Sequence, residues 1–140
     1  MITRRIHIMT VNLLTTPSCT SCRKAKQWLI DHEVDFVERN IFAKPLSEVE
    51  LKQILMLSEG GTDDVISTRS FLYDQYKSKM SSMTISQVIS LLATHPELIR
   101  RPILVDAKRI EFGFNEDEIR CFMPRSTRKC ELEKMVKKAL

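Results

Sequence analysis

Hydrophobic and polar positions near the start of the chain follow the periods of a strand, a helix and a second strand. Val11 to Leu14 is a short apolar run, and from Cys22 onwards the apolar positions recur at helical spacing. Residues 34–39 then alternate apolar and polar side chains, which is typical of a half-buried strand. This stretch therefore predicts a β-α-β unit whose helix ends near Glu33.

Two capping boxes indicate helices in the middle of the chain. In this motif a serine or threonine and a glutamate or glutamine three residues later satisfy free amides of the first helical turn. Ser47 with Glu50 predicts the start of one helix, and Gly60-Gly61 predicts its end. Thr84 with Gln87 predicts the start of a second helix.

The second of these helices is predicted to end before His95. Its expected apolar face consists of Ile85, Val88, Ile89 and Leu92. Between the two helices the periodicity is weaker, and residues 62–83 predict only a short helix around residues 71–76. Residues 43–101 are therefore interpreted as a helical insertion.

After the insertion the pattern returns to strands. Residues 103–105 and 109–112 predict a hairpin that ends at Gly113, and residues 115–122 predict a short helix. Residues 132–139 predict a last amphipathic helix. The expected order is β-α-β, then helices, then β-β-α.

A Cys-x-x-Cys motif at the first strand-to-helix junction of such a chain is typical of thioredoxin-like folds. We therefore expect an α/β protein with a mixed sheet and a helical insertion between its β-α-β and β-β-α halves. In such folds a proline opens the third core strand beside the thiols. Pro102 has that position, and by this analogy we predict a cis Arg101–Pro102 bond.

The length of 140 residues fits one domain, 1–140. Residues 1–9 form an extension for which an upstream start, a disordered tail and an extra stretch of strand remain open. The net charge of +4 is compatible with an acidic partner or with nucleic acid. We find no signal peptide and no apolar run that could span a bilayer, so we expect a cytoplasmic protein without membrane contact.

Cys19 and Cys22 are the candidate reactive residues. A helix N-terminus favours an anion by roughly 0.3–1 kcal/mol, and Arg23, Lys24 and Lys26 add positive charge, so we expect Cys19 to be the nucleophile. Residues three apart on a helix are neighbours, which places Cys22 within reach of a disulfide. The pair therefore predicts a redox switch. The alternatives are two inert cysteines or half of a zinc site.

Zinc requires four ligands, usually from two close pairs. Cys121 and Cys130 are too far apart in sequence to form a second such pair, and the three histidines are scattered. We therefore expect no metal and no other cofactor. Cys121 and Cys130 are interpreted as small hydrophobic residues.

Several separated blocks resemble one family. They are residues 16–25 (TPSCTSCRKA), 36–42 (FVERNIF), 61–64 (GTDD), 66–70 (ISTRS), 100–103 (RRPI) and 113–120 (GFNEDEIR). In sequence and in order they closely resemble the Spx-type stress regulators of the ArsC (arsenate reductase-like) family. The resemblance extends from Thr10 to about Arg128.

This resemblance implies a transcriptional regulator, and not an enzyme, that binds the C-terminal domain of the RNA polymerase α subunit. It implies that Cys19 and Cys22 form the redox-active disulfide that controls thiol and oxidative stress genes. By the same resemblance Gly61 is the polymerase-contact position, Arg101 faces the thiols, and Arg69 lies in a loop linked to the active complex.

The resemblance also implies degradation by the ClpXP protease with an adaptor, although residues 138–140 match the family tail only loosely. The basic residues between Arg120 and Lys138 are interpreted as a solvated surface or as a weak contact with promoter DNA through polymerase.

The alternative function is an arsenate reductase-like thiol oxidoreductase, in which Cys19 attacks an oxyanion held by Arg101 and Arg69. Cys22 and the block at Gly61 favour the regulator.

Overall fold

The computed structural model describes residues 10–123 and residue 136. The predicted extension at residues 1–9, the predicted helix at 132–139 apart from Val136, and Cys130 lie outside the described residues. The loosely matching tail at residues 138–140 also lies outside them.

The described strands form one mixed sheet. They are β1 (Val11–Thr15), β2 (Phe36–Asn40), β3 (Ile103–Val105) and β4 (Ile110–Phe112). The strand order is β2-β1-β3-β4. β1 pairs in parallel with β2 and antiparallel with β3, and β3 pairs antiparallel with β4. The predicted α/β class and mixed sheet are confirmed.

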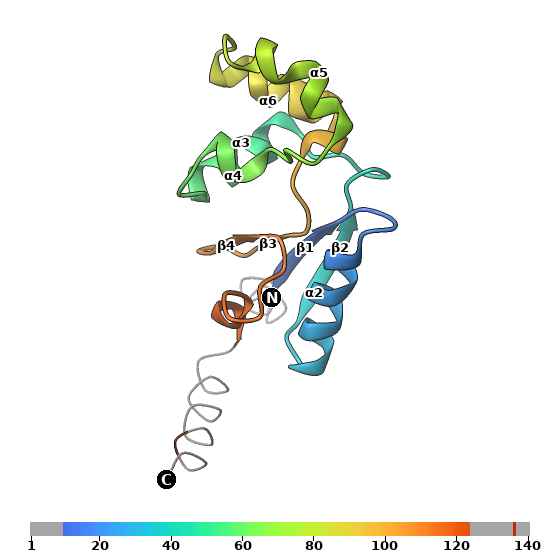
Figure 1. Ribbon diagram of the computed structural model, residues 1–140. Helices are drawn as coiled ribbons and strands as arrows, with labels where there is room; N and C mark the ends of the chain where they lie inside the picture. The colour runs from blue at the N-terminus through green and yellow to red at the C-terminus, as the bar shows by residue number, and fades with distance from the viewer. Residues whose placement is uncertain (1–9, 124–135, 137–140) are drawn as a thin grey trace.

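The helices divide into a thiol helix, a helical group and a short final turn. They are α2 (Thr20–Asp31), α3 (Glu48–Leu57), α4 (Thr62–Val65), α5 (Phe71–Met80), α6 (Ile85–Thr94), η1 (Pro96–Leu98) and η2 (Ile119–Phe122). Figure 1 shows α3 to α6 gathered above the sheet, whereas α2 lies beside β1 and β2. The helical group lies between β2 and β3 in the chain, where the sequence predicts an insertion.

One face of the sheet packs against α2 and η2. Leu13 of β1 and Leu104 of β3 are fully buried on this face, against Ala25 and Leu29 of α2. Burying a leucine side chain stabilises the folded state by about 1.5–3 kcal/mol, so this layer holds α2 firmly against the sheet.

The other face of the sheet packs against the helical group. Leu14 and Ile103, the neighbours of Leu13 and Leu104 along their strands, belong to a second core with Leu51, Ile54 and Leu92. Successive side chains of a strand point to opposite faces, which explains why adjacent residues enter different cores. The sheet therefore links the thiol helix to the helical group.

Both predicted capping boxes are present, at Ser47 with Glu50 and at Thr84 with Gln87. The predicted face of α6 is wrong at Ile85, which is 60% exposed because it is the first residue of the helix and lies outside the packed stretch.

The helix expected over residues 115–122 begins later than predicted. The Asn115 side chain accepts hydrogen bonds from the amides of Asp117 and Glu118 at 2.9 and 3.1 Å and forms a turn first. The helical segment itself is η2.

None of the described helices has both the length and the apolar character required to cross a lipid bilayer.

Candidate functional site

Cys19 lies at the N-cap of α2, the thiol helix. Its backbone is extended, and its Sγ accepts a hydrogen bond from the backbone N–H of Cys22 at 3.2 Å. Serine, threonine and aspartate usually fill this position, because their oxygen satisfies a free amide of the first turn. In α2 the Cys19 sulfur satisfies this amide instead of an oxygen. The contact also places the two cysteines beside each other, as the sequence predicts.

Cys22 is the buried member of the pair and is 4% exposed, whereas Cys19 is partly exposed. Burial is the largest cause that raises the pKa of the Cys22 thiol, to about 12, and the hydrogen bond with Cys19 adds to it. The backbone of Thr16 and the charge of Arg101 act in the opposite direction and lower this pKa. The pair is therefore asymmetric, because Cys19 is partly exposed whereas Cys22 is buried and its raised pKa favours the protonated thiol.

The loop that carries Cys19 has a strained backbone. Ser18 has a φ of 59°, in the left-handed region that residues other than glycine rarely adopt. Such a residue costs on the order of 1–3 kcal/mol and persists only where the surrounding structure holds it. On one side of it, Thr15 and Thr16 are buried, and on the other Cys19 begins the helix. The strain thus lies next to the thiol.

The positive charge of Arg101 lowers the pKa of the Cys22 thiol. Its Nη1 donates to the carbonyl oxygens of Glu97 and Ile99 at 3.1 and 3.2 Å. Its guanidinium carbon lies 5.7 Å from the centre of the Phe42 ring, within range of a cation–π contact. The Arg101–Pro102 bond is cis, as predicted. Arg101 is therefore held by two backbone carbonyls, and its charge acts on the Cys22 thiol.

Gly61 and Arg69 lie on the helical group rather than in the thiol loop. Gly61 is the N-cap of α4, with a φ of 62° and a ψ of −132°. This corrects its predicted place at the end of α3, because that helix already ends at Leu57 with Ser58 as its cap. Arg69 is exposed in the turn before α5. Figure 1 shows the α3–α4 turn and the β1–α2 turn on opposite sides of the molecule.

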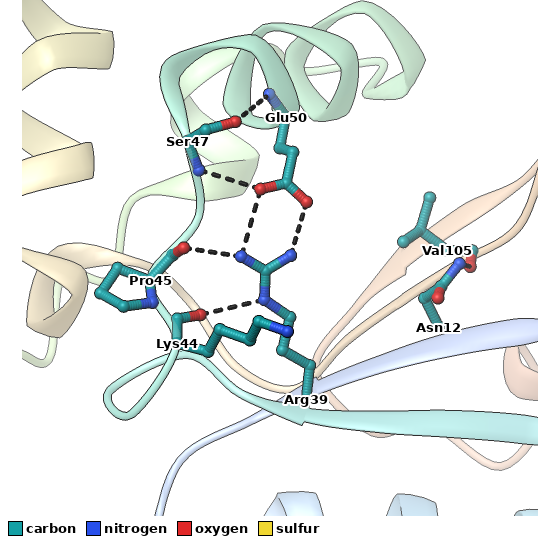
Figure 2. Close-up of polar contacts among 7 residues, drawn as sticks. All are labelled: Asn12, Arg39, Lys44, Pro45, Ser47, Glu50 and Val105. Carbon is teal, nitrogen blue, oxygen red and sulfur yellow. Dashed lines mark hydrogen bonds and ion pairs between the residues drawn. The ribbon is translucent and has the colours of Figure 1, made fainter.

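A contact between Arg39 and Glu50, which the sequence reasoning missed, joins the sheet to the helical group (Figure 2). The Arg39 guanidinium, at the end of β2, contacts the two carboxylate oxygens of Glu50 at 2.5 and 3.1 Å. It also donates to the carbonyl oxygens of Lys44 and Pro45 at 2.9 and 2.6 Å. Glu50 Oε1 in turn accepts the backbone N–H of Ser47 at 3.0 Å. One carboxylate therefore caps α3 and fixes it to β2.

Replacing Glu50 by Gln is expected to lower the free energy of unfolding by about 0.5–1 kcal/mol at pH 7. Glutamine preserves the capping box, as Gln87 does in α6, but removes the ion pair. The hydrogen bond from Arg39 is the largest cause that lowers the pKa of Glu50 below its ordinary 4.5. The ion pair therefore stabilises the fold above about pH 4.5, and this contribution is lost as the pH falls through the lowered pKa.

Urea unfolding of the wild type and of Glu50→Gln at neutral and at acidic pH measures this difference. If the difference in free energy of unfolding between the two proteins is the same at both pH values, the assigned role of the carboxylate charge is contradicted.

Cys121, interpreted from the sequence as a small hydrophobic residue, has a structural position. Cys121 packs at the edge of the core between α2 and the sheet. Among the residues that the structure describes, no group of three His, Cys, Asp or Glu side chains is arranged to hold a metal ion.

Comparison with known proteins gives consistent matches. The ArsC family model matches residues 14–122. The chain is 54% identical over 123 residues to the global transcriptional regulator Spx of Streptococcus pneumoniae strain R6, a match that covers 88% of this chain and 92% of that protein. It is 53% identical over 122 residues to the global transcriptional regulator Spx of Bacillus subtilis strain 168, covering 87% of this chain and 93% of that protein.

Solved structures share the fold. The crystal structure of an ArsC family related protein from Bacteroides fragilis has a TM-score of 0.74 at 31% identity, over 80% of this chain and 96% of that one. An arsenate reductase from Vibrio cholerae has a TM-score of 0.71 at 23% identity, over 82% of this chain and 98% of that one. At that lower identity the likeness extends to the fold alone.

Proposed function

The chain belongs to the ArsC family and, within it, to the Spx global transcriptional regulators, and on this premise we propose that it is a redox-sensing regulator of transcription. Oxidation joins Cys19 to Cys22 and changes the contact that the protein makes with RNA polymerase in the cytoplasm. The observation that carries the proposal is the contact between the Cys19 sulfur and the Cys22 amide.

The redox step requires an oxidant and two thiols. The Cys19 thiolate attacks an electrophilic nitrogen of an azo oxidant such as diamide. The N=N π bond opens, the second nitrogen takes a proton from solvent, and an S–N adduct forms at Cys19. The Cys22 sulfur then displaces the reduced oxidant and forms the S–S bond, while its proton leaves to solvent or to the leaving group. Two electrons pass from the thiols to the oxidant, and a dithiol reductant reverses the step.

The partner that we propose is the C-terminal domain of the polymerase α subunit, bound at the turn that contains Gly61. A Cβ added at Gly61 would meet no atom within 4 Å, so this side of the turn is open. In this proposal promoter DNA is contacted weakly and through polymerase. Control by ClpXP and an adaptor is retained as a proposal, and it concerns a tail outside the described residues.

Gly61→Arg is expected to reduce binding of the purified α C-terminal domain by at least tenfold, which corresponds to about 1.4 kcal/mol, because a large side chain would fill the approach to the turn. Gly113→Arg is the matched control. Gly113 also has a positive φ, of 78°, and open space around its Cβ position, but it lies after β4. Both variants therefore place a side chain at a positive φ, and only the first obstructs the proposed surface.

A pull-down of the α domain by wild type, Gly61→Arg and Gly113→Arg, each reduced and oxidised, tests the proposal. Equal loss of binding in both variants, or no binding by the wild type, would count against a polymerase contact at Gly61.

The alternative, an arsenate reductase-like oxidoreductase, shares the nucleophilic thiol. It would require Arg101 and Arg69 to hold an oxyanion together. Nη1 of Arg101 is already engaged by two carbonyl oxygens, and Arg69 is exposed in a turn of the helical group. We therefore expect no arsenate turnover with glutathione and glutaredoxin above that of Cys19→Ala. Turnover that depends on Cys19 would establish the alternative.

A further inference from the structure

β4 is the last strand of the sheet. In the part of the chain that the structure describes, β3 lies on one side of β4 and no strand pairs with the other side. The β3–β4 register pairs Leu104 with Glu111. Beyond the two ends of the ladder, the N–H of Gly113 donates to the carbonyl of Pro102, and the N–H of Asp106 donates to the carbonyl of Arg109.

Residues of an antiparallel strand alternate between those whose backbone groups face the partner strand and those whose backbone groups face away. These hydrogen bonds at both ends of the ladder place Glu111 in a pair whose backbone groups bond to β3. The N–H and C=O groups of Ile110 and Phe112 therefore face outward. These are the groups that an added strand would use.

A cavity of about 530 Å³ runs along this outer edge. The hairpin from Lys108 to Phe112 lines it, together with residues 57–59 at the end of α3, Asp64, Glu118 and Cys121. Cavities that hold ligands have volumes of about 300–1,000 Å³. The edge of β4 therefore faces a groove with room for the side chains of an extended segment.

Carboxylates and cationic side chains both line this groove, and the carboxylates act most strongly on Glu111. Burial of the Glu111 side chain and its proximity to the carboxylates of Glu118 and Glu59 raise the pKa of Glu111 to about 7. Arg100, Lys108 and Arg109 also line the cavity, and the Arg109 guanidinium donates to the carbonyl oxygen of Cys121. These cations leave the repulsion among the three carboxylates uncompensated at Glu111, so a further cation placed there would be attracted.

We propose that the outer edge of β4 is a docking site for an extended, basic segment of a partner protein. The segment would pair with the backbone groups of Ile110 and Phe112 as a fifth strand and place a lysine or arginine side chain among Glu59, Glu111 and Glu118. This site is separate from the thiol loop and does not depend on the redox proposal. Because β4 has three residues, few backbone bonds form, and charge selects the partner.

The probe is a short capped peptide in which lysine and valine alternate, added to the uniformly ¹⁵N-labelled full chain in the reduced state. Amide hydrogen exchange is followed residue by residue. In the free protein the amides of Ile110 and Phe112 should exchange quickly, and the amide of Glu111 should exchange slowly. Saturating peptide should slow the exchange of the first two amides by roughly fivefold or more and leave Glu111 unchanged, which makes Glu111 the internal control.

Glu111→Gln keeps the shape of the side chain and removes its charge, and it is expected to weaken peptide binding about threefold or more. Glu116→Gln is the matched control, since Glu116 is exposed before η2 and does not line the cavity. A thermal unfolding measurement of each variant checks that it is folded. A peptide with glutamate in place of lysine should bind more weakly than the lysine peptide.

Three results would overturn the proposal. Slow exchange of both outward amides in the free full chain would mean that the chain covers this edge itself. Protection by the peptide at other amides only would place its binding elsewhere. Equal binding of the basic and acidic peptides, or equal binding by Glu111→Gln and wild type, would remove the assigned charge selection.

Discussion

Iodoacetamide is expected to label Cys19 of the reduced protein at neutral pH while Cys22 stays almost unlabelled. The thiolate is the form that reacts. Burial raises the pKa of the Cys22 thiol from an ordinary 9.0 to about 12, which lowers its thiolate fraction by roughly a thousandfold. Burial of its side chain also blocks access by the reagent. Tandem mass spectrometry of the peptide that contains both cysteines, over a series of times and pH values, measures the labelling rate of each thiol.

The same assay tests the disulfide. After diamide, labelling of wild-type Cys19 should disappear and the monomer should lose the mass of two hydrogens, and dithiothreitol should restore both. Cys22→Ala should show neither the mass loss nor this protection in the monomer. Equal labelling of Cys19 before and after oxidation would end the redox proposal, and rapid labelling of Cys22 at neutral pH would contradict the pKa argument.

Leu29→Ala is expected to lower the free energy of unfolding by about 3 kcal/mol, within the range of about 2–5 kcal/mol for such core truncations. Leu29 lies in α2 and is fully buried against the sheet. Its loss removes apolar contacts and leaves a cavity beneath the helix that holds both cysteines. Equilibrium unfolding in urea, followed by circular dichroism, measures the change.

Ile30→Ala is the matched control for this substitution. Ile30 is the next residue of the same helix and is 50% exposed, so its truncation should change stability by about 0.5 kcal/mol or less. Similar losses in both variants would contradict the assigned packing of Leu29 against the sheet, because alanine has the higher helix propensity and truncation alone should not weaken α2.

Elements with a strong local signal could be predicted from the sequence. The capping boxes at Ser47 and Thr84 and the strand periods define most of the sheet and two helices, because these signals depend on neighbours within a few residues. The place of Cys19 at the start of α2 was predictable for the same reason.

Elements with a weak signal were predicted only in part. A short helix around residues 71–76 was predicted, and the structure has the longer α5, whose lack of buried residues leaves no clear apolar period to define its length. α4 was missed, because four residues are too few to show a period. The exposed N-terminal end of α6 shows the same limit, because the sequence does not tell where packing begins along a periodic face.

Long-range pairs also lay beyond the sequence. Arg39 and Glu50 meet because the loop between β2 and α3 folds back, and nothing in either local pattern indicates this. The crowding of Glu111 with Glu59 and Glu118 depends likewise on segments that only the fold brings together. Contacts of this kind join the elements, so the chemistry between elements was the hardest part to foresee.

The Cys19 sulfur is the proposed nucleophile, and it is also the N-cap acceptor of α2. Because it accepts the Cys22 amide, any covalent change at that atom also disturbs the acceptor on which the opening turn of α2 depends. The loss of this acceptor would act first on the opening turn of α2, the helix that packs against the sheet. An oxidised protein should therefore report its state through the amide resonances at the start of this helix, even where the rest of the backbone is unmoved.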